Sequence, residues 1–420
     1  MSALPSTRSY AEHLDSADPL AGFTERFARP EEDLIYLDGN SLGPMPLATA
    51  ARLAQVARSD WGQGLVRSWE HWIGLPAQAG DLAGQHLLGA APGQVLVSDS
   101  TTVNLFKLTH AALDAMPGRS VLITDDDNFP TDRYVLQGVA AQRGCELRMI
   151  RTDLDQGLDE DTLAAALGPD VALVSLSHVA YRSGALADMA RITGLVHDAG
   201  ALMLWDLCHS AGSVPVQLDE SGADLAIGCT YKYLNAGPGA PALLYVRAAL
   251  QDRLRQPVWG WFGNADQFAM GPEYDPVPGI ERFATGTPSI LGTVAVEEGV
   301  RLLAEAGIGR LRAKSVALTS YLIHLADEWL APHGFRLATP RADARRGGHV
   351  TLHHPDAWRI NRALIAAGVI GDYRTPDRLR LGPVPIATSF ADVWNGLDKL
   401  RQIAADRSYE DLPAALSRVT

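Results

Sequence analysis

The chain has 420 residues, of which 36 are basic and 49 are acidic, so its formal net charge is −13. This charge argues against a nucleic-acid or membrane-surface partner, because both carry phosphates and need a basic face. Hydrophobic residues at 47% and charged residues at 20% are typical of a soluble globular enzyme, and no apolar run approaches the ~20 residues of a membrane-spanning helix. We expect a cytoplasmic protein of two or three domains.

The N-terminal part of the chain is predicted to be mostly helical. The spacing of apolar residues predicts a helix over 10–27, a short strand over 34–37, and helices over 47–62 and 76–88. Between the strand and the second helix, residues 38–44 are dense in turn formers, which indicates an irregular loop.

Residues 90–245 alternate short apolar runs with amphipathic segments. The apolar runs predict strands over 95–97, 120–124, 147–150, 171–175, 201–205, 225–227 and 242–245. The amphipathic segments predict helices over 102–116, 132–143, 159–167 and 186–199. Strands that are apolar on both faces and separated by helices belong to a mainly parallel sheet, so we expect an α/β layer fold. Ligands of such sheets bind beyond the carboxyl ends of the strands.

The C-terminal part is predicted to be a smaller α+β domain. After a Gly- and Pro-rich stretch over 257–288, one long helical pattern runs from 291 through Gly307 to 331. Alternating signals follow, with strands over 335–337, 349–352 and 379–381 and helices over 357–367 and 390–405. We place the boundary near residue 295, so that 61–295 form the large domain, 296–420 the small one, and 1–60 contribute to the small one.

An aspartate and a lysine follow two neighbouring strands of the predicted sheet. Asp206 comes directly after the run 201–205, and Lys232 lies 26 residues further on, just past the run 225–227. Adjacent parallel strands end at the same edge, so we expect these two side chains to lie close together. Pyridoxal phosphate needs a Schiff-base lysine and a carboxylate for its ring nitrogen, and this pair suits it. The alternative is an ordinary Asp and Lys in surface loops.

The segment over 98–104 is a candidate phosphate site. Its sequence, Ser-Asp-Ser-Thr-Thr-Val-Asn, follows the run 95–97 and leads into the helix predicted from Thr102. Hydroxyls and free backbone N–H groups at a helix start converge on an anion. A simple helix cap remains the alternative.

Neither the cysteines nor a histidine group predicts a metal site. Cys145, Cys208 and Cys229 are separated by 63 and 21 residues, which matches neither a zinc ribbon nor a CxxC redox pair. Three histidines lie between residues 349 and 354, but no carboxylate or cysteine completes them at ligand spacing, and an exposed strand explains them as well. We expect reduced cysteines and no bound metal.

Six short segments, taken together, carry a family resemblance. They are Asp-Gly-Asn-Ser-Leu-Gly (38–43), Asn-Phe-Pro-Thr-Asp (128–132), Trp-Asp-Leu-Cys-His-Ser-Ala-Gly (205–212), Thr-Tyr-Lys-Tyr-Leu-Asn (230–235), Gly-Trp-Phe-Gly (260–263) and Arg-Leu-Gly-Pro-Val-Pro (380–385). In this order they resemble the kynureninases, which are pyridoxal-phosphate enzymes of fold type I in the class-V aminotransferase-like group. The resemblance covers residues 34–400.

This resemblance implies a role for each candidate site residue. Lys232 binds the cofactor and shuttles protons, Asp206 pairs with the pyridine nitrogen, and Arg380 binds the substrate carboxylate. The phosphate contacts implied are Thr101, Thr102 and Tyr231, with Trp261 and Thr287 contributed by the second subunit of a homodimer with shared active sites. The ring contacts implied are Phe129, which stacks on the ring, and Asp132, Ser177 and His209. Tyr231 is also the candidate second proton donor.

The reaction implied is hydrolytic Cβ–Cγ cleavage of L-kynurenine or 3-hydroxy-L-kynurenine. The products are anthranilate or 3-hydroxyanthranilate and L-alanine, in tryptophan catabolism and NAD biosynthesis through the kynurenine pathway. An aminotransferase of the same group is the main alternative. A cysteine desulfurase needs a catalytic cysteine in the C-terminal half, and no cysteine lies beyond Cys229. A cofactor-sensing DNA-binding regulator is disfavoured by the acidic charge.

Overall fold

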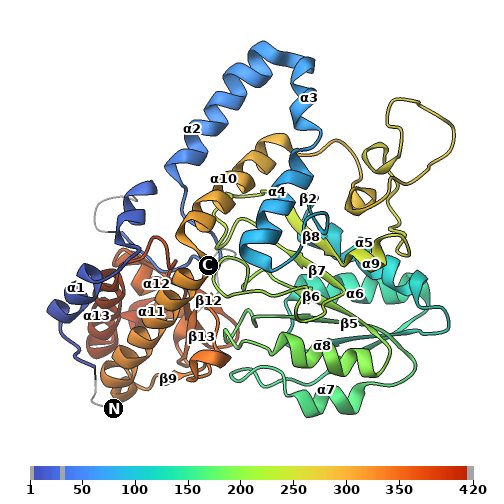
Figure 1. Cartoon of the computed structure of the whole chain (residues 1–420). Helices are drawn as coiled ribbons and strands as arrows, with labels where there is room; N and C mark the ends of the chain where they lie inside the picture. Colours follow the sequence, from blue (N-terminus) through green and yellow to red (C-terminus); the bar gives the residue numbers. More distant parts are fainter. Residues whose placement is uncertain (1–3, 29–33, 414–420) are drawn as a thin grey trace.

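The structure is a computed structural model that describes residues 4–28 and 34–413, and its larger sheet has seven strands (Figure 1). Their spatial order is β2 (Val95–Ser98), β8 (Ala242–Val246), β7 (Leu225–Gly228), β6 (Leu202–Asp206), β5 (Val171–Ser177), β3 (Val121–Asp125) and β4 (Glu146–Ile150). All neighbouring strands are parallel except at β8, which is antiparallel to β2 and β7. The predicted α/β fold with a mainly parallel seven-stranded sheet is confirmed.

Helices cover both faces of this sheet. The helices on one face are α4 (Leu75–Ala83), α7 (Glu160–Ala166), α8 (Met189–Asp198) and α10 (Ile290–Ala306), and those on the other are α5 (Thr101–Ala115) and α6 (Pro130–Arg143). Side chains of a strand alternate between these two cores, so Val174 joins the first and Leu173 the second. Because both faces are buried, polar groups become accessible at the strand ends.

A second sheet lies in the C-terminal part of the chain. Its four antiparallel strands are, in spatial order, β12 (Asp372–Arg374), β13 (Arg378–Leu381), β10 (Val350–His353) and β9 (Arg336–Leu337). The helices nearby are α11 (Ile308–Trp329), α12 (Ala357–Ala366), α13 (Phe390–Asp406) and the N-terminal α1 (Arg8–Ser16), and α1 lies beside α13 (Figure 1).

The N-terminal segment packs with this second sheet. Strand β1 (Ile35–Tyr36) pairs in parallel with β11 (Val369–Ile370), and one hydrophobic cluster joins Ala11 and Leu37 to Leu397. The loop over 38–43 therefore runs along the end of β13, where the Gly39 N–H donates to the Gly382 carbonyl at 2.9 Å.

Three predicted helices have different bounds in the structure. The prediction of one helix over 10–27 is wrong, because α1 ends at Ser16 and a separate 3-10 helix, η1 (Ala21–Arg26), follows. Between the two helices, the Asp18 carboxylate accepts the Leu20 N–H at 2.8 Å. The single helix predicted over 291–331 is broken at Gly307, whose φ of +79° few other residues adopt. The helix predicted over 186–199 begins only at Met189, since the Asp188 side chain caps it.

A helical arm projects from the body of the molecule (Figure 1). It consists of α2 (Leu47–Gln55), the π-helix η2 (Val56–Gly64), η3 (Leu65–Ser68) and α3 (Trp69–Trp72), and it exposes Trp61 and Val66. Within residues 4–28 and 34–413, no helix has both the length and the apolar composition needed to cross a bilayer.

Asp155 links the loop after β4 to the second sheet, and its removal is expected to destabilise the fold. Its carboxylate accepts hydrogen bonds from Arg378 Nη2 at 2.5 Å and from Arg336 Nη1 at 2.6 Å. Burial opposes ionisation of Asp155, but the bonds and charges of the two arginines outweigh it and lower its pKa. Asp155→Asn should reduce the free energy of unfolding at neutral pH by about 1–2 kcal/mol, since Arg336 is largely exposed.

The pH dependence of this loss checks its electrostatic origin. A carboxyl whose folded pKa is lowered stabilises the protein above its unfolded pKa, and that stabilisation is lost as the pH falls through the folded value. Urea unfolding should therefore show a constant difference between wild type and Asp155→Asn near neutrality and a smaller one below about pH 4. An equal difference at both pH values would show that charge is not its cause.

Candidate active site

The structure brings Lys232, His209 and Phe129 together at the carboxyl edge of the large sheet. Lys232 follows β7, and His209 follows the adjacent strand β6. Lys232 Nζ lies 3.1 Å from His209 Nε2 and 5.8 Å from the centre of the Phe129 ring. Burial and the charge of Lys232 hold the pKa of His209 well below its usual range, so its imidazole is neutral and can accept a hydrogen bond from Lys232 Nζ.

Asp206 is a buried carboxylate at the end of β6. Its Oδ1 accepts the Cys208 N–H at 2.7 Å, and Ser177 Oγ lies 3.3 Å from its Oδ2. Within the described part of the chain, Asp206 forms no ion pair. A buried carboxylate without a cationic neighbour in bonding contact fits a positively charged ring N–H, which is what a protonated pyridine nitrogen offers.

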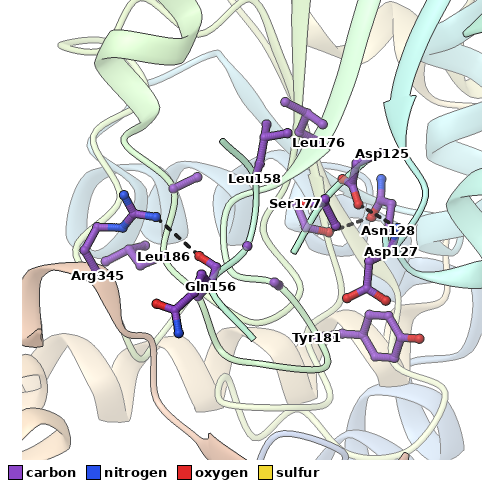
Figure 2. Close-up of a pocket in the computed structure, with 15 residues that line it drawn as sticks. Asp125, Asp127, Asn128, Gln156, Leu158, Leu176, Ser177, Tyr181, Leu186 and Arg345 are labelled. Carbon is purple, nitrogen blue, oxygen red and sulfur yellow. Dashed lines mark hydrogen bonds between the residues drawn. The ribbon is translucent and has the colours of Figure 1, made fainter. Parts of the chain in front are cut away.

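Ser177 and Asn128 connect this carboxylate to a small cavity. Ser177 Oγ donates to Asn128 Oδ1 at 2.8 Å, and the two side chains point toward each other (Figure 2). Beyond them is a cavity of about 30 Å³, lined among others by Asp125, Asp127 and Tyr181. Its volume is sufficient for one or two water molecules.

Asp132 has a buried carboxyl oxygen without a hydrogen-bond partner among the described residues. The residue is buried in the first turn of α6, and its Oδ2 makes no hydrogen bond to any described residue. Burial and the negative charge of Asp206 raise its pKa well above the usual range, although Lys232 works in the opposite direction. Buried polar atoms are rarely left unpaired, so this atom also fits a polar substituent of a bound ligand.

The start of α5 forms the anion end of the site. Ser100 caps this helix by accepting the Val103 N–H at 3.3 Å, and Thr101 and Thr102 form its first turn. Thr101 Oγ1 lies 3.9 Å from Cys208 Sγ, which places the helix start beside the loop after β6. Free N–H groups and hydroxyls at this point fit a phosphate.

Tyr231 also lies beside Lys232. The centre of its ring is 6.0 Å from Lys232 Nζ. Burial, with the neighbouring Cys229 thiol, raises the pKa of Tyr231 far above its usual range, so the phenol keeps its proton at neutral pH. The loop over 38–43 supports this segment, because the Gly43 N–H donates to the Tyr231 carbonyl at 2.8 Å, and a Cβ at Gly43 would lie 2.2 Å from the Lys232 carbonyl oxygen.

Arg380 reaches the same site from β13 of the second sheet. Its side chain is buried, and Nη1 donates to the Tyr181 carbonyl at 2.5 Å. The Tyr181 ring packs edge-on against Phe129, with 5.3 Å between centroids. Arg380 also forms an ion pair with Asp372 of β12.

Trp261 and Thr287 have contacts outside the group around Lys232. Trp261, in η5 (Trp261–Gly263), packs on Phe262 and Phe268, and Thr287 lines a separate cavity of about 240 Å³ near Asp99. Within residues 4–28 and 34–413, neither residue makes a hydrogen bond or ring contact to Lys232.

Comparisons with known proteins identify the family. The family described as Kynureninase C-terminal domain matches residues 311–400. A kynureninase of Pseudomonas fluorescens is 45% identical over 407 residues, which covers 94% of this chain and 95% of that protein. A kynureninase of Burkholderia pseudomallei (strain 1106a) is 46% identical, with the same coverage. The chain belongs to the kynureninase family.

Solved structures show that this kynureninase-family chain shares the fold of pyridoxal-phosphate enzymes. The cysteine desulfurase CsdA of Escherichia coli has a TM-score of 0.78 at 18% identity, covering 94% of this chain and 99% of that one. A variant of C-DES with glycine covalently linked to its PLP cofactor has a TM-score of 0.76 at 19% identity, covering 91% and 97%. At these identities the likeness shows the fold alone, which is the predicted fold type I.

Several residues of this kynureninase-family site were not predicted from the sequence. Tyr181 and Asp372 carry no local pattern that marks them, since their contacts come from distant segments. His349 was explained by an exposed strand, and this is wrong: it is fully buried, and its ring centroid lies 5.7 Å from that of His209. Among the described residues, no group of three or more His, Cys, Asp or Glu side chains has the arrangement of a metal site.

Proposed function

We propose that this chain hydrolyses L-kynurenine or 3-hydroxy-L-kynurenine, with pyridoxal 5′-phosphate as cofactor. The products are anthranilate or 3-hydroxyanthranilate and L-alanine, which places the chain in tryptophan catabolism and NAD biosynthesis. The observation that carries this function is the identity with kynureninases over nearly the whole chain, at 45% with the Pseudomonas fluorescens enzyme. Asp206 and Lys232 at one edge of the large sheet, with Arg380 reaching the same site from β13, support it.

The described side chains fit each part of the cofactor. Lys232 would hold it covalently, the Asp206 carboxylate would pair with the ring nitrogen, and Phe129 would pack on the ring. The start of α5, with Thr101 and Thr102, would bind the phosphate together with Tyr231. Asp132, Ser177 and His209 would bind the polar ring substituents. When bound, the cofactor supplies an electron sink for negative charge that develops on the substrate carbons.

The chain's own residues orient the substrate and move its protons. The Arg380 guanidinium binds the α-carboxylate, and this fixes the Cα–H bond toward Lys232. Lys232 Nζ takes the proton from Cα, and neutral His209 beside it accepts a hydrogen bond from that amine. Water adds to the γ-carbonyl, and the hydrated carbon loses a hydroxyl proton as the Cβ–Cγ bond breaks and anthranilate is released. Tyr231 donates a proton to Cβ and is reprotonated by the proton released from that hydroxyl, and Lys232 returns its proton to Cα, so that alanine forms.

Tyr231→Phe tests this proton donor. Removal of one hydroxyl leaves the ring in place, so cofactor affinity should be unchanged while kcat falls by about 10² or more. Tyr233→Phe is a matched control, because it removes another buried phenol hydroxyl one residue beyond Lys232 and should leave kcat near that of wild type. Equal kcat for Tyr231→Phe and wild type would remove Tyr231 from this role.

We further propose a homodimer in which Trp261 and Thr287 of each chain complete the phosphate site of the other. The two residues do not contact Lys232 of their own chain within the described residues, which supports this arrangement. Trp261, Phe268 and Met270 also expose large apolar surfaces on one loop, as interface residues do. Size-exclusion chromatography with light scattering should show a dimer, and an active monomer would refute the shared site.

We propose that the protein is cytoplasmic, which its net negative charge and its proportions of hydrophobic and charged residues favour.

We also propose that 61–295 form the large cofactor-binding domain and 296–420 the small one, to which 1–60 contribute. The packing of Ala11 and Leu37 with Leu397 supports this role of the N-terminal segment, and α10 spans the proposed boundary.

Product analysis distinguishes hydrolysis from amino transfer, the main alternative reaction. Cofactor-loaded protein is incubated with L-kynurenine in the absence and presence of a keto acid, and the products are separated by chromatography. Hydrolysis predicts equal amounts of anthranilate and alanine without any keto acid. Product formation that requires the keto acid, without anthranilate, would replace this function by amino transfer.

A further inference from the structure

The Arg380 guanidinium has no free pair of donors for a second carboxylate. Nη2 has two hydrogens, and its acceptors are Ser41 Oγ at 3.1 Å and the Asp372 carboxylate. Nη1 donates to the Tyr181 carbonyl at 2.5 Å. A guanidinium binds a carboxylate through two parallel hydrogen bonds, which come either from Nε and Nη2 or from Nη1 and Nη2. Both arrangements use a hydrogen of Nη2. A carboxylate that binds Arg380 in this way must therefore displace Ser41 or Asp372.

Asp372 already touches an alternative partner. The same oxygen, Oδ2, that binds Arg380 also forms an ion pair with Arg374 Nη2 at 2.8 Å and accepts a hydrogen bond from Ser41 Oγ at 3.1 Å. Oδ1 has no hydrogen-bond partner among the described residues. Asp372 is 1% exposed, whereas the Arg374 side chain is 30% exposed. A short shift of the carboxylate would leave it paired with Arg374 alone, without the cost of a buried unpaired charge.

A second carboxyl group completes the cluster. Asp38 lies on the loop that runs along β13, and burial, with the charge of Asp372, raises its pKa to about 6, while Arg380 acts in the opposite direction. Two guanidinium groups thus face two carboxyl groups in a buried space. The cluster is near neutral before any ligand arrives, and an added anion has to compete with Asp372 for Arg380.

We propose that Asp372 is an internal counter-carboxylate, which occupies Arg380 in the substrate-free enzyme and shifts to Arg374 when the substrate carboxylate binds. This inference rests on the proposed function, in which Arg380 binds that carboxylate. Asp372 is a positioning residue rather than a catalytic one, because it acts on the substrate through Arg380. Its consequence is selectivity: a small anion cannot replace Asp372 easily, but a substrate that gains further contacts at the cofactor can.

The test compares acetate, as a minimal carboxylate, with L-kynurenine on the cofactor-loaded protein. Asp372→Asn keeps the shape and removes the competing charge, so the inhibition constant of acetate should fall about tenfold or more, and KM should not rise. Arg374→Gln removes the alternative partner of Asp372, so it should raise both the inhibition constant of acetate and the KM for L-kynurenine. Asp155→Asn is the matched control, since it removes one of the two carboxylate partners of Arg378 on the same strand and should leave acetate inhibition unchanged.

The double variant separates displacement from simple attraction. In the Asp372→Asn background, Arg374→Gln should change the inhibition constant of acetate little further, because the carboxylate that would shift to Arg374 is no longer present. An undiminished effect would mean that Arg374 attracts the anion directly and would overturn the displacement step. A higher KM with unchanged acetate inhibition in Asp372→Asn would also overturn the proposal, because Asp372 would then only anchor Arg380.

Thermal unfolding keeps this test independent of the reaction. Acetate, compared with chloride at equal ionic strength, should raise the melting temperature of Asp372→Asn more than that of wild type, since it binds the folded form more tightly. Ser41→Ala, which frees an Nη2 hydrogen without removing a charge, should show a smaller shift of the same sign if Asp372→Asn fails to fold. No extra stabilisation in either variant would overturn the inference, whereas a wild type that makes no anthranilate would overturn only the proposed function.

Discussion

Lys232→Ala should abolish kynurenine hydrolysis and the covalent attachment of the cofactor together. Lys232 Nζ lies beside Phe129 and His209, and it is assigned both the attachment and the movement of the Cα proton. Loss of a group with both functions should lower kcat by about 10⁴ or more. The measurement is steady-state anthranilate formation, with borohydride reduction and mass spectrometry to follow the lysine-linked cofactor.

Two controls separate loss of chemistry from loss of folding. Lys399→Ala changes a lysine whose Nζ donates to the Ala367 carbonyl in the small sheet region, and it should keep both the activity and the linked cofactor. A small alkylamine added to Lys232→Ala should restore part of the activity, since it can replace the missing base. Steady-state turnover near wild type in Lys232→Ala would contradict the assignment.

Arg380→Lys should lower kcat/KM for L-kynurenine by about 10²–10³, mainly through KM. A lysine keeps the positive charge but lacks the planar pair of donors that binds a carboxylate in two places. It also cannot replace all of the bonds that Arg380 makes to Tyr181, Ser41 and Asp372. Initial rates over a range of substrate concentrations measure the effect.

An analogue of L-kynurenine that lacks the α-carboxylate makes this prediction specific. Wild type should bind the analogue far less tightly than the substrate. Arg380→Lys should reduce this difference in affinity, because the substitution weakens the contact with the α-carboxylate, which the analogue lacks. Arg378→Lys, on the same strand but paired with Asp155 and Asp377, is the control and should preserve the discrimination. An equal loss for substrate and analogue in Arg380→Lys would place the carboxylate elsewhere.

The large sheet and the positions of Asp206 and Lys232 could be predicted because both depend on local sequence. Each strand is a short apolar run, and a parallel order places Asp206 and Lys232 at one edge once the strands are known to be neighbours. The same reasoning failed where one residue decides the geometry. Apolar periodicity continues through Gly307, but the chain turns there with positive φ and begins a new helix.

The surroundings of Arg380 could not be predicted, because they join segments that are far apart in the chain. Ser41 lies in the N-terminal loop, while Asp372 and Arg374 lie on β12, a three-residue strand too short to give a period-two pattern. Their meeting depends on the pairing of β1 with β11 and of β12 with β13. A pattern within one segment contains no information about such pairings.

Anthranilate fluorescence after L-kynurenine is added to pyridoxal-phosphate-loaded protein tests the proposed reaction most directly. We expect a steady rise with wild type and none with Lys232→Ala at the same concentration. Repeating the measurement with 3-hydroxy-L-kynurenine covers the second substrate. A wild-type protein that binds the cofactor through Lys232, yet releases neither anthranilate nor 3-hydroxyanthranilate, would contradict the proposed hydrolysis.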